Sequence, residues 1–201
     1  MPARRVPHPP PDLDRRKLPV DSISKPDTLY RIHRSVHGPL WFGPGAGNPA
    51  AYRFDAPGGE YGVCYFGVTP GASFAETFLR TPPVRLIAME ELAARSLAIL
   101  RPRRSLRLVS LHGPGLARLG ATAEVASGGY GLSREWSIAL WRHPSAPDGI
   151  LYRCRHDDES FAIALFDRAG DAVDHESSDP WLRRPALLAA LARRYGFGLI
   201  P

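Results

Sequence analysis

Two arginines, a tyrosine and a glutamate in the N-terminal half of the chain have side chains that could do chemistry together: Arg31, Arg53, Tyr65 and Glu76. A planar guanidinium can hold a phosphate through two charge-assisted hydrogen bonds, and an aromatic face can stack on a flat ring. A carboxylate can stabilise developing positive charge or accept a proton. One interpretation is a cleft that holds a negatively charged nucleotide and breaks a bond in it. The other is that these residues serve only packing and surface solubility.

The segments that carry these residues predict a strand, a loop, a second strand and a helix. In chain order they are a half-buried strand at 28–34 (TLYRIHR), a glycine- and proline-rich loop at 39–52, a buried strand at 61–68 (YGVCYFGV) and a helix at 69–81. Alternating apolar and polar residues indicate the first strand, and a Thr-Pro pair is typical of the helix start. Arg53 directly follows the loop, so only the fold can bring it to the others.

The rest of the chain interleaves strands with a few short helices. Strands are predicted at 84–89, 96–101, 106–111, 148–156 and 160–168, with the polar turn DDE between the last two, and helical segments at 90–95, 113–120, 132–143 and 179–196, the last disturbed near Pro185. The helices are too few and too short for repeated βαβ units. We therefore predict an α+β fold with a mainly antiparallel sheet and flanking short helices.

A length of 201 residues suits a single domain. The first 26 residues carry seven prolines, which prevent regular structure and leave little to bury. We expect a flexible proline-rich arm over 1–26 and one domain over 27–201.

The net charge of +6 favours anionic partners such as a nucleotide, a nucleic acid or an acidic protein. The arginines are scattered, however, and no finger spacing or RNP-like motif is present, so direct nucleic-acid binding is not expected. No apolar run approaches the roughly 18 to 20 residues of a membrane span, and the N-terminus lacks the apolar segment of a secretion signal. We expect a cytoplasmic protein.

Standard motifs give no function. The two cysteines, Cys64 and Cys154, are each alone in their segments, which is typical of buried reduced thiols. The seven histidines show no HExxH or HxH spacing, so no metal is expected. Walker A, GxGxxG and GxSxG patterns are absent, and GPGAGNP reads as a loop.

Taken in order, the segments over residues 28 to 168 resemble the RES-domain family, whose members are bacterial toxins that consume NAD and are often encoded with an Xre-type antitoxin. The resemblance is carried by LYRIHR, YRFDAPGGEYG, GVCYFG and SFAETF, with eleven residues from tyrosine to glutamate, and by the later stretch GYGLSREWSIALWRHPSAPDGILYRCRHDDESFAIALF. One position differs from the family pattern, and a second can be aligned with it in two ways. Cys154 stands where the family has a serine, and a second family serine falls on Gly131 or Ser133, of which we take Ser133.

The resemblance implies an ADP-ribosyltransferase-like cleft with NAD as substrate. In such a cleft Arg31 and Arg53 would hold the phosphates, and Tyr65 would stack on the nicotinamide ring. Glu76 would stabilise positive charge on the ribose, hydrogen-bond a ribose hydroxyl or accept a proton from the nucleophile. Ser133 would bind the nicotinamide amide or a phosphate at a helix start. An antitoxin that blocks the cleft would be the natural partner.

Simpler interpretations exist for each of these residues. Arg31 could be a surface residue of its strand, Tyr65 a core or rim residue, and Glu76 part of an exposed helix face. Ser133 could be a helix N-cap. Cys154 and the placement of Ser133 also leave open a catalytically silent module of the same fold that binds a nucleotide or an acidic protein.

Overall fold

The fold is organised around one strongly curved, eight-stranded sheet. The computed structural model describes residues 7–24, 27–45, 47–80 and 86–201. The strands of this sheet are, in spatial order, β1 (Val20–Ile23), β6 (Leu106–Leu111), β7 (Gly149–Cys154), β8 (Asp157–Phe166), β3 (Val63–Gly67), β2 (Leu29–Arg34), β5 (Arg95–Pro102) and β9 (Val173–Pro180). The neighbours β6 and β7 are parallel, and the other pairs are antiparallel. The predicted α+β class with a mainly antiparallel sheet is therefore confirmed.

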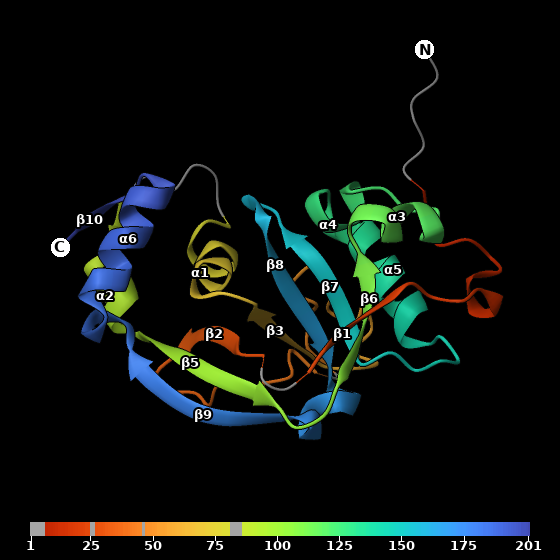
Figure 1. Ribbon diagram of the computed structural model, residues 1–201, viewed down its shortest axis with the longest axis horizontal. Coiled ribbons are helices and arrows are strands. Elements are labelled where there is room, and N and C mark those ends of the chain that lie inside the picture. Colours follow the sequence, from red (N-terminus) through yellow and green to blue (C-terminus); the bar gives the residue numbers. More distant parts are fainter. Residues whose placement is uncertain (1–6, 25–26, 46, 81–85) are drawn as a thin grey trace, which may run out of the picture.

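Short helices cover the concave side of this sheet in separate groups (Figure 1). They are α1 (Pro70–Phe78), α2 (Met89–Ala93), α3 (Gly113–Leu119), α4 (Glu124–Ser127), α5 (Tyr130–Trp141) and α6 (Pro185–Tyr195), with 3-10 turns η1 (Leu13–Arg15), η2 (Asp167–Ala172) and η3 (Trp181–Arg183). In Figure 1, α3, α4 and α5 lie beside β6 and β7, α2 and α6 lie at the opposite end, and α1 lies between these groups. A small parallel pair, β4 (Leu86–Ala88) and β10 (Gly198–Ile200), accompanies α6. No helix in the described ranges is both long and apolar enough to cross a membrane.

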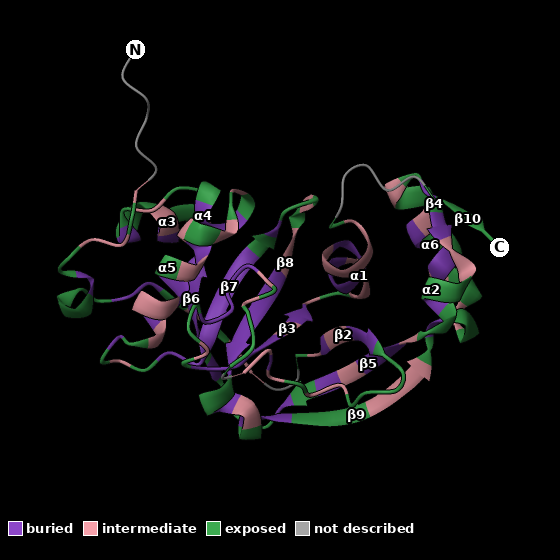
Figure 2. Cartoon of the chain, turned by 180° about the vertical axis from the view of Figure 1, so that it is seen from behind, coloured by how far each residue is buried: buried purple, intermediate pink, exposed green. Residues whose placement is uncertain are grey.

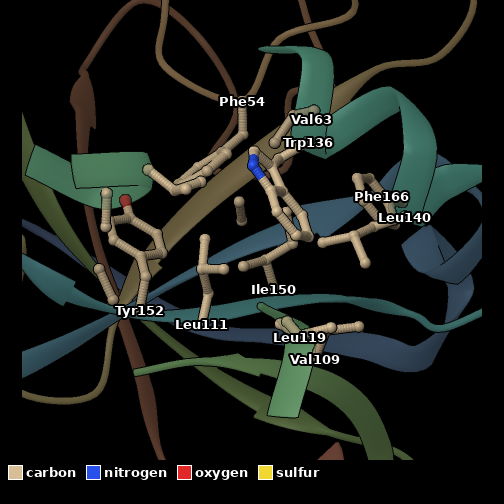
Figure 3. Close-up of a cluster of buried hydrophobic side chains, with 14 of the residues drawn as sticks. Phe54, Val63, Val109, Leu111, Leu119, Trp136, Leu140, Ile150, Tyr152 and Phe166 are labelled. Atoms are coloured by element: carbon tan, nitrogen blue, oxygen red, sulfur yellow. The ribbon is translucent and has the colours of Figure 1, made fainter. Parts of the chain in front are cut away.

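Because side chains alternate along the central strands, each face of the sheet carries its own hydrophobic cluster. On β3, Val63 packs in one hydrophobic cluster and its neighbours Cys64 and Phe66 in another, as period-2 geometry requires. The first cluster joins the sheet to the α3–α5 group through large side chains such as Trp136 and Tyr152 (Figure 3). The central strands β3 and β7 and the second half of β8 are accordingly mostly buried, whereas the edge strand β9 is largely exposed (Figure 2).

The sheet is weakest between β2 and β3, where a single Cα pair, Tyr30 with Gly67, connects the two strands. Helix α1 packs against this seam, and the Ser73 hydroxyl donates a hydrogen bond to the Tyr30 carbonyl at 2.6 Å. A Cβ on Gly67 would collide with the Ser73 backbone nitrogen, so the close approach of α1 requires glycine there. The local sequence also starts the helix as predicted, because the Thr69 side chain caps it by accepting from the Ala72 N–H.

Parts of the described N-terminal segment pack on the domain, which differs from the expectation of a flexible arm. Residues 20–23 form β1 and pair with β6, and Leu13 and Leu18 are buried in the main cluster. The Trp136 indole N–H donates to the Pro7 carbonyl at 2.9 Å. The prolines disfavour an α-helix, but an extended segment can still add to an exposed sheet edge. Residues 1–6 and 25–26 of the predicted arm lie outside the described residues.

Most predicted elements are present, with two corrections near the C-terminus. The residues DDE begin β8 instead of forming a turn. The helix predicted over 179–196 starts only at Pro185, since the preceding residues complete β9 and a 3-10 turn. Proline is well suited to the first position of a helix because its missing N–H would have no partner there. Residue 81 of the predicted α1 segment and residues 84–85 of the β4 segment lie outside the described residues.

A buried carboxylate joins the β5–β6 turn to the start of β7, and its contribution to stability should depend on pH. Asp148 accepts two hydrogen bonds of 2.8 Å from Arg104 and one of 2.7 Å from the Arg107 N–H. Burial alone would raise the pKa of Asp148, but these hydrogen bonds outweigh it and hold the pKa below its usual value of 3.8.

We predict that Asp148→Asn lowers the free energy of unfolding by about 1.5 to 3 kcal/mol at neutral pH. A depressed folded-state pKa stabilises the protein above the unfolded value, so this contribution is lost as pH falls below about 4. Urea unfolding of both proteins at about pH 7 and about pH 3 should show a difference that shrinks in acid. The exposed Asp158→Asn is the matched control, and an equal difference at both pH values would contradict the assignment.

Candidate functional site

A cavity of about 530 Å³ opens at the seam between β2 and β3, beside α1. Its walls come from β2, β3, α1, the end of β7 and the loops that follow β2 and precede β3. The cavity brings together Arg31, Arg53, Tyr65 and Glu76, although they lie on two strands, a loop and a helix. Its size falls within the roughly 300 to 1,000 Å³ typical of small-molecule sites.

The charge of the cavity wall is strongly positive. Six lining residues are arginines, namely Arg31, Arg34, Arg53, Arg80, Arg95 and Arg155, whereas Glu76 is the one lining carboxylate among the described residues. Within the same described ranges, Arg95 is the only one of the six that forms an ion pair, with Glu91 at 2.9 Å. Unpaired guanidinium groups in a concave site attract anions, and diphosphates in particular.

Arg53 is buried without a carboxylate partner in the described part of the chain. Its side chain donates through Nη1 to the Gly128 carbonyl at 2.8 Å and to the Ser133 hydroxyl at 3.2 Å, and its guanidinium lies 5.0 Å from the centre of the Tyr130 ring. Burial lowers the pKa of Arg53, which reflects the cost of keeping a cation out of water. An anionic ligand in the cavity would offset that cost.

Arg31 enters the cavity from the middle of β2. Its Nη1 donates to the Cys64 thiol at 2.8 Å and to the Tyr65 carbonyl at 3.1 Å, so neighbouring β3 fixes the guanidinium. Its Nε is buried and has no hydrogen-bond partner among the described residues. The protein therefore leaves part of the hydrogen-bonding capacity of Arg31 unused.

The hydroxyl of Tyr65 is hydrogen-bonded within the protein, so its ring is the part that can contact a ligand in the cavity. The hydroxyl donates to Asp55 Oδ1 at 2.9 Å and accepts from the Phe54 N–H at 2.9 Å. Burial, with the negative charge of Asp55, holds the pKa of Tyr65 well above its usual value. The ring contacts Tyr52 edge-on, with centroids 5.7 Å apart. Tyr65 is thus arranged for ring contacts and not for proton transfer.

Glu76 projects from α1 toward β7. Its Oε2 accepts a hydrogen bond of 2.9 Å from the Tyr152 hydroxyl, and the nearby Cys154 thiol lies 4.0 Å from the Ala72 carbonyl, to which it donates. Burial and then the charge of Glu76 raise the pKa of both the Tyr152 phenol and the Cys154 thiol. Both groups therefore stay protonated near neutral pH and can act as donors to the carboxylate.

Ser133 lies behind the cavity wall and is not among its lining residues. It is fully buried in the first turn of α5, donates to the Val125 carbonyl at 2.6 Å and accepts from Arg53. In this arrangement its contact with a ligand would pass through the Arg53 guanidinium. The predicted direct contact of Ser133 with a ligand stays a prediction.

Several lining residues were not predicted from the sequence, although most of them lie in stretches that carry the family resemblance. They are Tyr52, Arg80, Tyr130, Tyr152, Arg155 and His156. Arg80 lies over the Tyr52 ring at 4.5 Å, which adds a cation and an aromatic face to the wall. Asp55, which fixes Tyr65, was also missed, although it stands two residues after Arg53 in the quoted stretch YRFDAPGGEYG. No group of three or more residues of the types His, Cys, Asp or Glu that could hold a metal is found in the described ranges.

The chain thus has a curved mixed sheet with a cationic cavity, and comparison with known proteins gives its family. The model of the RES domain matches residues 28–185, so this chain belongs to the RES domain family. It is 35 % identical over 101 residues to a protein named "Probable toxin y4kH" from Sinorhizobium fredii (strain NBRC 101917 / NGR234), a match that covers 50 % of this chain and 76 % of that protein.

The fold also matches a solved structure. A chain in the crystal structure of the M. tuberculosis MbcT–MbcA toxin–antitoxin complex superposes with a TM-score of 0.60, and the match covers 90 % of this chain and 94 % of that chain. At 16 % sequence identity this likeness concerns the fold. The predicted family and fold class are thus confirmed.

Replacing the buried guanidinium should weaken anion binding. We predict that Arg53→Gln lowers the affinity for ADP roughly 10- to 100-fold, because a charge-assisted hydrogen bond to the diphosphate is lost. Isothermal titration calorimetry at low salt would measure it. Arg118→Gln, on the exposed face of α3, is the matched control and should bind ADP as the wild type does. Equal affinities for wild type and Arg53→Gln would show that the cavity does not hold the diphosphate through Arg53.

Proposed function

We propose that this protein is a toxin-like enzyme that cleaves NAD at the bond between nicotinamide and ribose. The observation that carries the proposal is that one cavity brings together the guanidinium groups of Arg31 and Arg53, a tyrosine ring held by its own hydroxyl and Glu76, the one carboxylate among its described lining residues. NAD offers a diphosphate, a flat nicotinamide ring and a ribose whose C1′ becomes positive as the bond breaks. Each of these parts has a complementary group in the cavity.

Each lining residue would have a separate role in binding NAD, set by the chemistry of its side chain. Arg31 and Arg53 would hold the diphosphate, since both present guanidinium groups that no carboxylate pairs within the described residues. Tyr65 would support the nicotinamide ring, because its hydroxyl is already bound to Asp55. Ser133 would act through Arg53, whose orientation it helps to fix. Arg80 with Tyr52 offers a further stacking surface for the adenine end.

The bond cleavage balances without a further cofactor. The C1′–N bond breaks and its electron pair goes to nicotinamide, which neutralises the pyridinium charge and leaves an oxocarbenium-like ribose. Glu76 would stabilise that positive charge and could accept the proton of the incoming nucleophile. The nucleophile, which is water, phosphate or a group on a protein, forms the new bond to C1′.

The similar proteins support the proposal of a partner protein. One similar protein is named a probable toxin, and the matched structure is that of a toxin–antitoxin complex. We propose that an antitoxin, of the Xre type that the family resemblance implies, binds this chain and closes the cavity. A protein that depletes NAD would need such a partner to be tolerated by its own cell.

Removal of the carboxylate tests the chemistry. We predict that Glu76→Gln lowers kcat for nicotinamide release at least roughly 100-fold and changes KM much less, since the charge acts mainly in the transition state. Chromatography of free nicotinamide, ADP-ribose and ADP-ribose 1-phosphate, with and without a protein acceptor, gives the rate and identifies the nucleophile. Glu159→Gln, an exposed glutamate on β8, is the matched control.

Equal nicotinamide release by wild type and Glu76→Gln would remove Glu76 from the chemistry. Tight NAD binding by the wild type without any release would instead identify a catalytically silent nucleotide-binding module.

Toxicity is tested in cells. We predict that expression of the wild-type chain alone in a bacterial host slows growth and lowers the NAD pool, whereas Glu76→Gln at equal protein level does neither. The measurements are growth curves and enzymatic NAD assays, with immunoblots to match expression. Unchanged growth and NAD in cells that hold the folded wild-type protein would contradict a toxic role.

A further inference from the structure

The hydroxyl of Tyr152 makes the best-defined contact with the proposed catalytic carboxylate. It donates to Glu76 Oε2 at 2.9 Å, and Tyr152 is only 1 % exposed. The contact crosses between two elements that are far apart in sequence, β7 and α1. A hydrogen bond to a charged acceptor, shielded from water, is among the stronger polar interactions in a protein.

Tyr152 is itself held rigidly. Its strand, β7, lies inside the sheet, so that Tyr152 is opposite Leu111 of β6 on one side and Ala162 of β8 on the other. Its ring packs edge-on against Phe54, with centroids 4.9 Å apart, within the main hydrophobic cluster (Figure 3). The hydroxyl therefore occupies a fixed position relative to the sheet, whereas Glu76 is a side chain with several rotatable bonds.

Other groups near Glu76 do not offer the same geometry. The Cys154 thiol is a weak donor, and its hydrogen bond goes to the Ala72 carbonyl at 4.0 Å. Arg53 and His156 are coupled to Glu76 electrostatically, and an interaction of this kind does not fix the direction of the carboxylate. Tyr152 combines a strong donor, a rigid strand and a short distance.

We infer that Tyr152 is a positioning residue, whose hydroxyl holds one oxygen of the Glu76 carboxylate so that the group stays aimed at the ribose carbon. This inference rests on the proposed function. Tyr152 takes no part in bond making: its proton stays on the phenol, and it acts only through Glu76. The local sequence around Tyr152, GILYRC, does not indicate this role.

The substitution Tyr152→Phe removes only the hydroxyl and keeps the ring packed against Phe54. We expect kcat for nicotinamide release to fall roughly 10- to 100-fold, with KM changed by less than about twofold. The matched control is Tyr61→Phe, since Tyr61 is an equally buried tyrosine of the same cluster that donates to the Ser137 hydroxyl at 2.7 Å and does not line the cavity. Urea unfolding of both variants separates lost stability from lost activity.

A double-mutant cycle tests whether Tyr152 acts through Glu76. Glu76→Asp shortens the side chain and withdraws the carboxylate from the Tyr152 hydroxyl, so in that background Tyr152→Phe should have little further effect on kcat. If the kcat of Glu76→Asp is too low to measure, the test is the comparison of Tyr152→Phe with Tyr61→Phe. Of these two variants, only Tyr152→Phe should lower kcat while leaving KM nearly unchanged.

The outcomes separate this inference from the proposed function. No nicotinamide release by the wild type would end the proposed function. An active wild type that depends on Glu76, together with an unchanged kcat in Tyr152→Phe, would overturn the inference alone. So would an equal loss of kcat from Tyr152→Phe in the wild-type and Glu76→Asp backgrounds, or a loss no larger than that of Tyr61→Phe.

Discussion

A buried guanidinium without a carboxylate partner in the described residues is the constraint around which this site is built. Arg53 has little access to water, and its hydrogen bonds go to a carbonyl and a hydroxyl, both neutral. Removing a cation from water is costly unless a counter-charge is supplied, and among the described residues that line the cavity only Glu76 carries one. An anionic ligand bound in the cavity would offset that cost. Pre-organised charge of this kind contributes to recognition because the protein does not have to rearrange when the ligand arrives.

The strand pairing of the sheet determines where these charged groups lie. A continuous antiparallel sheet would fill the space between β2 and β3 with paired backbone, but these strands share a single Cα pair. The resulting opening is bordered by α1, which a glycine on β3 allows to approach closely. Functional groups from a strand, a loop and a helix can then face one another across a short distance. Most other strand pairs of the large sheet are continuous and supply the rigid frame.

Behind the groups that face the cavity lies a second set that fixes them. Asp55 binds the Tyr65 hydroxyl and the Ala51 and Tyr52 N–H groups, which connects β3 to the loop that carries Arg53. Ser133 holds Arg53 from α5. Arrangements of this kind lower the entropic cost of reaching a reactive geometry, since each side chain has only one well-packed orientation. The site thus depends on contacts among the sheet, α1 and α5 together.

The sequence by itself determined the local elements and the inventory of chemistry. Periodicity and the Thr-Pro start predicted β2, β3 and α1, and the order of motifs indicated the family and the four residues Arg31, Arg53, Tyr65 and Glu76 that the structure places in one cavity. The sequence did not give the pairing of residues 20–23 with β6, because a short extended segment is ordered only by the sheet edge it meets. Nor could it show that Ser133 lies behind Arg53 or that Tyr152 reaches Glu76. Those contacts join residues 80 and 76 positions apart, and long-range contacts of this kind exist only once the chain has folded, because no local preference encodes them.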